Sequence, residues 1–336
     1  MEPPQPHALG APFSFKDMKI LFTADIHIKL NQKNVPVPWA LNRYELLLDK
    51  LWDLQENCDL FVIGGDVFDK IPSMEELEVY FDLVASCRIP TIIYNGNHEA
   101  LKKNTTFLTN LKSVTSKINS QVQIVDDYWS DPPAGLDIIP YNKLKEWEKE
   151  GNAVFQSLHN KVLLTHVRGE IPPHVKPEID LDRFASWKLV LAGDLHSYSN
   201  SQRNILYPGS PVTTSFHRNP VETGVIILDT EDLSHVWHVL DLPQLIRKTV
   251  KAGEAMVAGE VHHVIYEVEG NLSELEQVQD SELLDKKLTR RNTDTALLLD
   301  PAMGLEGEVH EYLMYVLNLN EDFIKEVLKE FKNYDR

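Results

Sequence analysis

Five short polar clusters between residues 25 and 196, with a sixth just beyond them, carry residue types suited to metal-dependent hydrolysis. The clusters are Asp25-Ile26-His27, Gly64-Gly65-Asp66-Val67-Phe68-Asp69, Gly96-Asn97-His98-Glu99, Thr165-His166, Gly193-Asp194-Leu195-His196 and Tyr207-Pro208-Gly209-Ser210. Carboxylates, imidazoles and an amide oxygen form the mixed oxygen and nitrogen ligand set of two-metal hydrolytic centres. Because each cluster follows a short apolar run, we expect one dinuclear site, built from loops on a single sheet.

Taken singly, most of these clusters have a simpler structural explanation. An isolated Asp-x-His is common, and a Gly-Asp pair is often a turn or a helix cap. A lone strand-end histidine such as His166 usually bonds to main chain. Gly96–Glu99 is more specific, because three site-type residues directly follow an apolar strand. The hydrolytic interpretation rests on all the clusters occurring in this order at strand ends.

The chemistry of such a site assigns roles to the first clusters. Two divalent ions about 3.5–4 Å apart clamp the attacking and leaving oxygens of a phosphoester, and one carboxylate must bridge them. Asp66 suits the bridge, because the two preceding glycines permit a sharp turn. Asp25 and His27 are two apart on an expected extended segment, so they point to the same side and can share one ion.

The remaining roles fall to the clusters that follow. Asn97 offers an amide oxygen and His166 an imidazole to the other ion. His98 cannot easily bind the ion that its neighbour binds, so it is free to protonate the leaving oxygen. Asp69 is a candidate to orient the His98 imidazole through its carboxylate.

The segments that must position these residues are short strands and helices. Apolar runs rich in β-branched residues predict buried strands at residues 19–23, 60–63, 91–94, 162–164 and 189–191. Apolar spacing predicts helices over 41–54 and 74–84. This alternation predicts a mostly parallel sheet covered on both faces. After Ser210, residues 224–229 and 236–240 are expected to be antiparallel strands that complete a second sheet.

The composition changes near residue 243, where the metal-ligand clusters stop. Residues 262–268 predict a strand, which a polar, Glu-rich helical stretch and an apolar run at 295–299 follow. Apolar stripes at 309–317 and 323–331 predict a terminal helix pair, with Asn320 as an N-cap. Such stripes usually pack on their own domain, but a pair behind the linker-like Gly304–Gly307 can dock a partner's helices.

Length and composition are those of an ordinary globular protein of 336 residues. The Pro-rich residues 1–17 have neither the basic nor the apolar region of a signal peptide, so we expect a disordered extension. No uncharged apolar run is long enough to span a bilayer. Cys58 and Cys87 are beside apolar runs, which predicts buried thiols in a reducing, intracellular compartment.

The formal charge of −18 argues against a general electrostatic binder of nucleic acid. It does not exclude a nuclease, because metal ions offset the charge of their carboxylate ligands. Several basic residues flank the clusters. Each is most simply a solvated surface charge, but together they are a candidate positive rim for phosphates: Lys29, Lys33, Lys102, Lys103 and Arg168.

The series of clusters resembles the pattern of the calcineurin-like metallophosphoesterase superfamily: D-x-H, G-D-x-x-D, G-N-H-[DE], a lone histidine and G-H-x-H. Within it, the chain is most similar to the SbcD-type DNA repair nucleases, including recombination nuclease subunits of large phages. The similarity rests on Met18–His27 (MKILFTADIH), the length, Tyr207–Pro211 (YPGSP) and the C-terminal module. Specific motifs cover residues 18 to 230, and beyond them the resemblance rests on layout.

The resemblance implies a four-layer α/β/β/α sandwich over 18–242, a small α+β capping domain over 243–303 and C-terminal helices over 304–336. It also implies two manganese ions, with magnesium as the alternative. One ion would be held by Asp25, His27, Asp66 and His196, and the other by Asp66, Asn97, His166 and Asp194. His98 would be the general acid.

One position departs from the family's pattern. The expected G-H-x-H is Gly193-Asp194-Leu195-His196 here, so a carboxylate replaces an imidazole. Manganese accepts oxygen ligands well, and the added negative charge should make the second ion bind tightly. We therefore expect Asp194→His to leave a working but altered enzyme.

The resemblance further implies a capping domain that contacts DNA and terminal helices that grip the coiled coil of an SbcC-type ATPase. It implies a homodimer within a heterotetramer, without membrane attachment. Four residues form the only dense basic cluster of the module and are candidate DNA-backbone contacts, with a solvated helix face as the simpler explanation: Lys286, Lys287, Arg290 and Arg291.

The expected activity is that of a manganese-dependent exonuclease and endonuclease acting on double-stranded DNA. The compact size favours a phage origin, which would place the protein in the cytoplasm of the bacterial host. Two alternatives remain open: a metallophosphatase or nucleotide phosphodiesterase with the same metal core, and a non-catalytic scaffold with the same fold. The first would need no capping module, and the second would hold no metal.

Overall fold

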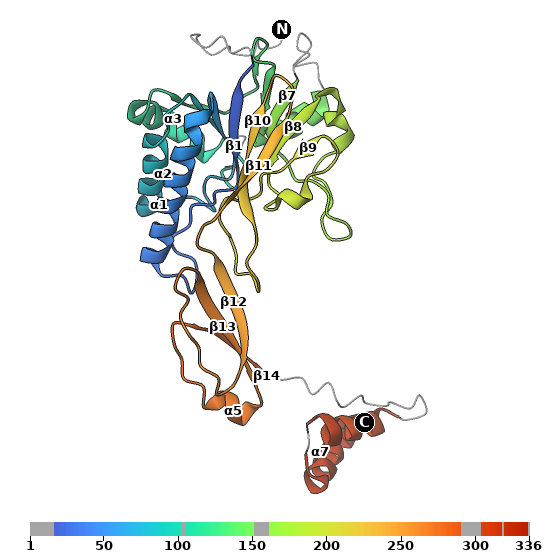
Figure 1. Ribbon diagram of the computed structural model, residues 1–336. Helices are drawn as coiled ribbons and strands as arrows, with labels where there is room; N and C mark the ends of the chain where they lie inside the picture. The colour runs from blue at the N-terminus through green and yellow to red at the C-terminus, as the bar shows by residue number, and fades with distance from the viewer. Residues whose placement is uncertain (1–16, 102–104, 151–160, 290–303, 318, 335–336) are drawn as a thin grey trace. The chain divides into compact units, whose positions relative to one another are not determined.

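A computed structural model describes residues 17–101, 105–150, 161–289, 304–317 and 319–334 (Figure 1). The chain divides into two compact units. The first runs to Lys248 and includes 257–266, and the second holds 249–256 and the residues from 267 onward. Residues 1–16 of the predicted extension and the apolar run 295–299 lie outside the described residues.

The first unit contains a six-stranded sheet with the order β11-β10-β1-β2-β3-β4. Four neighbouring strands run parallel: β1 (Lys19–Thr23), β2 (Leu60–Gly64), β3 (Thr91–Tyr94) and β4 (Val122–Val125). The strands predicted at 19–23, 60–63 and 91–94 are confirmed. Their carboxyl ends lie at one edge of the sheet, and the first three polar clusters follow them there.

Strands β10 (Thr223–Asp229) and β11 (His235–Leu240) form the antiparallel pair that the sequence predicts. Their expected place in a second sheet is wrong, because β10 pairs antiparallel with β1 and extends the first sheet. Both faces of β10 are covered there. Ile226 and Leu228 enter the core between the sheets, while Val225 packs against the helices.

Three helices cover the outer face of this sheet: α1 (Val37–Leu54), α2 (Met74–Ala85) and α3 (Phe107–Ile118) (Figure 1). The two helices predicted from apolar spacing are confirmed as α1 and α2. Helix α2 begins with a capping box, in which Ser73 and Glu76 each accept a hydrogen bond from the other's main-chain N–H. Cys58 and Cys87 are buried free thiols in the same core, as predicted.

The second sheet has the order β5-β6-β7-β8-β9. Its strands are β5 (Trp129–Asp131), β6 (Leu136–Ile139), β7 (Val162–His166), β8 (Leu189–Gly193) and β9 (Ile205–Leu206). Its inner face shares one core with the first sheet, where Leu164 and Leu191 are buried with Phe22 and Val62. The single sheet expected from the apolar runs is therefore wrong. Strands buried on both faces look alike in sequence, so the pattern does not tell which sheet each joins.

Helix α4 (Tyr141–Glu150) and the 3₁₀ turn Leu181–Ser186 cover the outer face of the second sheet. Trp147 of α4 stacks on Phe184 of the turn, with the ring centroids 5.2 Å apart. The layers are thus helices, sheet, sheet and helices. The predicted α/β/β/α sandwich is the fold of the first unit.

After the sandwich in the chain comes a three-stranded sheet of β12 (Leu245–Lys251), β13 (His263–Gly270) and β14 (Leu284–Thr289), with the short helix α5 (Leu272–Glu276). The strand predicted at 262–268 is confirmed. Lys286 and Lys287 lie on β14, so the alternative that placed them on a helix face is wrong. Leu284 and Leu288 are four residues apart, a spacing that also occurs on one face of a helix, so the apolar pattern did not separate the two possibilities.

The terminal helices are α6 (Leu305–Glu311), which continues into a π-helical turn over Tyr312–Val316, and α7 (Glu321–Tyr334). Asn320 caps α7 as predicted, since its Oδ1 accepts a hydrogen bond from the Phe323 N–H at 2.9 Å. The linker expected at Gly304–Gly307 is instead the first turn of α6, where Gly304 is the N-cap. None of the described helices combines the length and hydrophobicity needed to cross a bilayer.

Candidate metal centre

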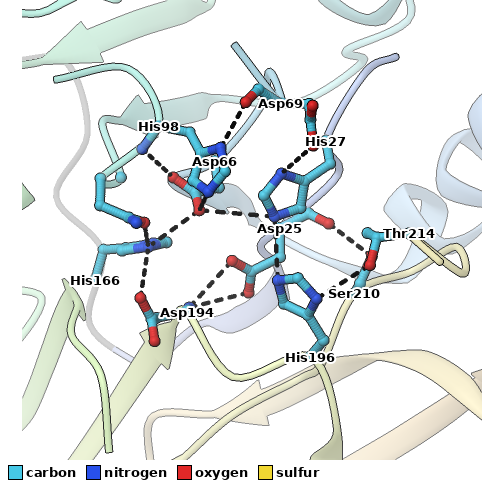
Figure 2. A network of polar contacts seen from close by, with 12 residues as sticks. Asp25, His27, Asp66, Asp69, His98, His166, Asp194, His196, Ser210 and Thr214 are labelled. Atoms are coloured by element: carbon cyan, nitrogen blue, oxygen red, sulfur yellow. Dashed lines mark hydrogen bonds and ion pairs between the residues drawn. The ribbon is translucent and has the colours of Figure 1, made fainter. Parts of the chain in front are cut away.

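Loops that follow five strands converge on one place in the first unit (Figure 2). The first sheet contributes Asp25, His27, Asp66, Asn97 and His98, and the second contributes His166, Asp194 and His196. Ligand atoms lie within 4.8 Å of one another in three overlapping groups: Asp25, His27 and His196; His27, Asp66 and His98; Asp25, Asp66 and His166. The predicted ligands therefore lie together, and they come from two sheets rather than one.

Asp66 lies at the middle of these groups. Its Oδ2 is 3.5 Å from His166 Nε2, 3.6 Å from His27 Nε2 and 3.9 Å from His98 Nε2. Its Oδ1 accepts a hydrogen bond from the His98 main-chain N–H at 2.9 Å. A carboxylate with one oxygen fixed and the other surrounded by imidazoles is well placed to bridge two ions.

The backbone at four of the ligands is held in the left-handed region. The φ angles are +57° at Asp25, +48° at His27, +50° at Asp66 and +102° at Asp194. Each costs on the order of 1–3 kcal/mol and persists only where surrounding bonds enforce it. The expected extended segment at Asp25–His27 is therefore wrong. These two side chains meet because both backbones turn.

Two glycines allow the loops to approach one another closely. A Cβ on Gly65 would lie 2.5 Å from His166 Nδ1, and a Cβ on Gly96 would lie 2.1 Å from Asp66 Oδ1. Gly65 also has a φ of +88°. Any larger residue would push Asp66 and His166 apart, which explains the glycine at each of these loop positions.

Glu99 holds two of these loops together, a role that its position in the sequence does not reveal by itself. Its buried carboxylate accepts hydrogen bonds from the main-chain N–H groups of Asp66 at 3.0 Å, Phe68 at 2.9 Å and Gly96 at 2.8 Å. Burial raises the pKa of Glu99 to about 7. Its place as the fourth residue of the Gly96–Glu99 cluster was the signal that could have found it.

His166 presents one ring nitrogen to the centre. Its Nδ1 lies 2.9 Å from the Gly64 main-chain oxygen, so Nε2 faces Asp66. Burial lowers the pKa of His166, but the carboxylates of Asp66, Asp25 and Asp194 outweigh this and raise it to about 10. A group of carboxylates that binds a proton so firmly at an imidazole also attracts a metal ion.

The amide of Asn97 tests whether these residues fit a metal ion. Its outer atom is 3.0 Å from His166 Nε2 and 2.9 and 3.2 Å from the two Asp66 oxygens. An amide oxygen facing two carboxylate oxygens is repulsive unless a cation lies among them. A bound cation would make this a favourable place for the oxygen. The donor set thus fits a hard divalent ion.

His27 and His196 form a second candidate position for a metal ion. Their Nε2 atoms face each other at 3.1 Å. Burial lowers the pKa of His27 to about 3 and lowers that of His196, so both imidazoles are neutral and offer lone pairs. His196 Nδ1 contacts Thr214 Oγ1 at 3.2 Å, and the Ser210 hydroxyl donates to the Asp25 main-chain oxygen at 2.7 Å. Ser210 thus holds the main chain of Asp25, and Thr214 holds the ring of His196 that faces His27.

The side chain of His98 is 37% exposed, whereas those of His27 and His166 are at most 4% exposed. His98 Nδ1 lies 2.5 Å from the main-chain oxygen of Asp69. The expected contact with the Asp69 carboxylate is not made, because that carboxylate pairs with Lys29 Nζ at 2.8 Å. Asp69 therefore orients His98 through its main chain.

The basic residues proposed from sequence fall into separate sets. Lys29 pairs with Asp69, and Arg168 pairs with Asp194 at 3.2 Å, so both border the centre. Lys33 is exposed on the same unit. Lys286 and Lys287 lie in the second unit, where they pair with Glu267 and Asp280. The other four lie outside the described residues: Lys102, Lys103, Arg290 and Arg291.

Comparisons with known proteins identify relatives of this chain. The family model of calcineurin-like phosphoesterases matches residues 18–198. The chain is 41% identical over 328 residues to the "probable exonuclease subunit 1" of Escherichia phage T5, covering 94% of this chain and 98% of that protein. It is 25% identical over 268 residues to the "putative phosphoesterase 244L" of Invertebrate iridescent virus 6, covering 70% and 86%.

Among solved structures, the protein TT1561 of Thermus thermophilus aligns with a TM-score of 0.41 at 12% identity, covering 66% of this chain and 98% of that one. The family match spans more than half of the chain and includes every candidate ligand from Asp25 to His196. The chain therefore belongs to the calcineurin-like phosphoesterase family and is a metal-dependent phosphodiesterase.

Proposed function

We propose that this protein is a manganese-dependent DNA nuclease, with exonuclease and endonuclease activity on double-stranded DNA. The observation that carries the proposal is the convergence of carboxylate, amide and imidazole ligands around Asp66, with His98 exposed beside it. The name of the phage T5 relative, an exonuclease subunit, supports DNA as the substrate. Manganese suits the mixed oxygen and nitrogen donors, and magnesium is the alternative.

The side chains of this centre divide the work of hydrolysis. Bound divalent ions supply positive charge that polarises the phosphoester and activates water. Asp66 and the other carboxylates hold that charge in place. The Asp69 main-chain oxygen can only accept a hydrogen bond, so His98 Nδ1 carries a hydrogen. A second proton on Nε2 is then available for the departing sugar oxygen.

The proposal extends to a complex of the SbcCD type. In it, residues 18–242 would form the nuclease domain, 243–303 would contact DNA and 304–336 would bind the coiled coil of an SbcC-type ATPase. Large apolar side chains are exposed on the terminal helices, which supports a partner there: Tyr312, Tyr315, Leu317 and Phe323. A homodimer within a heterotetramer, in the cytoplasm of a bacterial host, completes the proposal.

The role of His98 can be tested with end-labelled duplex DNA in manganese. We expect His98→Ala to lose about 10²- to 10⁴-fold of the cleavage rate while retaining both ions, because only the proton donor is removed. The matched control is His174→Ala, an exposed histidine outside the centre. Full activity of His98→Ala would show that His98 is not the acid.

The substrate class can be tested separately. The rates of hydrolysis of linear duplex DNA and of a small aryl phosphodiester are compared at equal enzyme and manganese concentrations. A DNA nuclease should strongly prefer the duplex. A preference for the small ester would favour the phosphatase or nucleotide phosphodiesterase alternative, and failure to bind manganese at millimolar concentration would favour the scaffold.

A further inference from the structure

Asp194, the candidate ligand that departs from the family's pattern, forms an ion pair with Arg168. Arg168 Nε donates to Asp194 Oδ2 at 3.2 Å. Asp194 Oδ1 lies 4.0 Å from His166 Nε2 (Figure 2). The two oxygens of the Asp194 carboxylate therefore have different partners. One oxygen is held by the guanidinium, and the other faces the imidazole that belongs to the centre.

The two residues are brought together by strand register. His166 at the end of β7 pairs with Gly193 at the end of β8, so the residues that follow each strand emerge side by side. The Val167 N–H donates to the Gly193 oxygen at 3.2 Å, and the Tyr207 hydroxyl donates to the Val167 oxygen at 3.1 Å. These hydrogen bonds fix the main chain that precedes Arg168.

The main chain is fixed on the other side as well. The Arg168 oxygen accepts a hydrogen bond from the Glu178 N–H at 3.1 Å. The Asp194 N–H lies 3.1 Å from each oxygen of Asp25. The side chain of Asp194 is only 7% exposed, whereas that of Arg168 is 46% exposed. The ion pair therefore joins a buried carboxylate to an arginine whose main chain is fixed by hydrogen bonds, unlike a pair of freely moving surface charges.

A charge count explains why such a pair occurs here. An imidazole ligand is neutral, and a carboxylate in its place adds one negative charge beside Asp25 and Asp66. Arg168 adds one positive charge at hydrogen-bonding distance. The net charge of Asp194 and Arg168 together is therefore zero, the same as that of the neutral imidazole in the family's pattern. The pKa of Arg168 is raised chiefly by Asp194, which agrees with this coupling.

We infer that Asp194 and Arg168 act as one charge-neutral unit that stands in place of the imidazole of the family's pattern. In this unit Arg168 is a positioning residue, which holds Asp194 Oδ2 and leaves Oδ1 for the ion. The inference rests on the proposed metal-dependent function and adds a residue that the family's ligand pattern does not contain.

The two single substitutions should shift manganese affinity in opposite directions. Arg168→Ala leaves an uncompensated carboxylate, so one of the two sites should bind Mn²⁺ about tenfold more tightly. Asp194→His leaves an uncompensated guanidinium, so that site should bind about tenfold more weakly. The double variant Arg168→Ala/Asp194→His restores the charge and should return to within about threefold of the unchanged protein.

The experiment is calorimetric titration of Mn²⁺ into each metal-free, full-length variant, with the melting temperature measured in parallel. Arg168→Lys keeps the charge and should stay within about threefold of the unchanged protein. The matched control is Arg203→Ala, since Arg203 is 44% exposed and pairs with Asp182 at 2.6 Å outside the centre. It should leave both affinities unchanged.

Each outcome decides the question. Opposite shifts with recovery in the double variant establish the unit. Equal affinity of Asp194→His and the double variant, an unchanged Arg168→Ala, or weaker binding in both single variants would overturn it, and the last result would indicate a purely structural contact. If the unchanged protein binds no Mn²⁺, the proposed function itself fails, and the inference fails with it.

Discussion

The loops after β1 and β2 and the loop after β8 contribute candidate ligands to the same centre, but their surroundings differ. Asp25, His27 and Asp66 are at most 4% exposed. The side chain of Asp194 is 7% exposed but contacts Arg168, which is 46% exposed, and His196 is exposed. The first set is enclosed by glycines and by the hydrogen bonds of Glu99, whereas the second borders solvent and is held by Arg168 and Thr214.

This difference bears on where a ligand of the centre can be replaced by another residue type. In the buried set, each ligand shares its space and main-chain bonds with another, so a new side chain disturbs several groups at once. At the exposed border, a neighbouring side chain can change charge to compensate. The departure from the family's pattern occurs at Asp194, whose partner Arg168 is exposed. Substitutions in the two sets should therefore differ in their effects.

Asp66→Asn should break the buried set. We expect the cleavage rate to fall by at least about 10³-fold, because the bridging charge is lost. Duplex hydrolysis and bound manganese per chain are measured together. Asp194→Asn, at the exposed border, should lose only about 10- to 100-fold. The control Asp137→Asn alters a buried carboxylate outside the centre. A loss below tenfold in Asp66→Asn would contradict the contrast.

Glu99→Gln should loosen the buried set without removing a ligand. One acceptor oxygen becomes an NH₂ group that faces main-chain donors, so the free energy of unfolding should fall by about 1–3 kcal/mol. Manganese affinity should fall about 10- to 100-fold. Glu76→Gln is the matched control, since Glu76 is buried and accepts main-chain N–H bonds outside the centre. It should lose stability but retain affinity.

Two histidines of the centre, the buried His166 at the end of β7 and the exposed His196 after β8, should respond oppositely to pH when metal is removed by a chelator. The pKa of His166 is raised from 6.5 to about 10, so its contribution to stability is complete below pH 6.5 and is lost as the pH rises toward 10. The pKa of His196 is lowered, so its effect appears only as the pH falls below 6.5.

Denaturant unfolding at several pH values separates these two histidines. Between pH 6.5 and 10, the stability gap between the unchanged protein and His166→Gln should shrink by at least about 1 kcal/mol. The gap for His196→Gln should stay constant over the same range. Parallel behaviour of the two variants would mean that their surroundings do not differ as described.

Lys29→Ala should have the smallest effect. Lys29 borders the centre beside Asp69, so its loss should weaken duplex binding about two- to fivefold and reduce the salt dependence by about one phosphate contact. Binding is measured across a salt series with catalytically impaired His98→Ala protein. Lys19→Ala, at the opposite end of β1, is the control and should bind DNA as the parent does.

Much of the fold was predictable because apolar strands and amphipathic helices carry local signals. The strand at 19–23 was found with its observed bounds, and the helix at 74–84 ended one residue early. The assignment of strands to sheets was not predictable in this way. The strands at 224–229 and 189–191 are apolar on both faces, so only pairing with β1 or β7 decides their sheet.

The amino-acid sequence alone predicted the candidate ligands and the departure at Asp194, because ligand types and strand-end positions are local properties. The three-dimensional structure was needed to see that two sheets contribute to the centre, that Glu99 bonds to two of its loops and that Arg168 pairs with Asp194. These contacts join segments far apart in the chain, and register and packing, which no local pattern encodes, bring them within bonding distance.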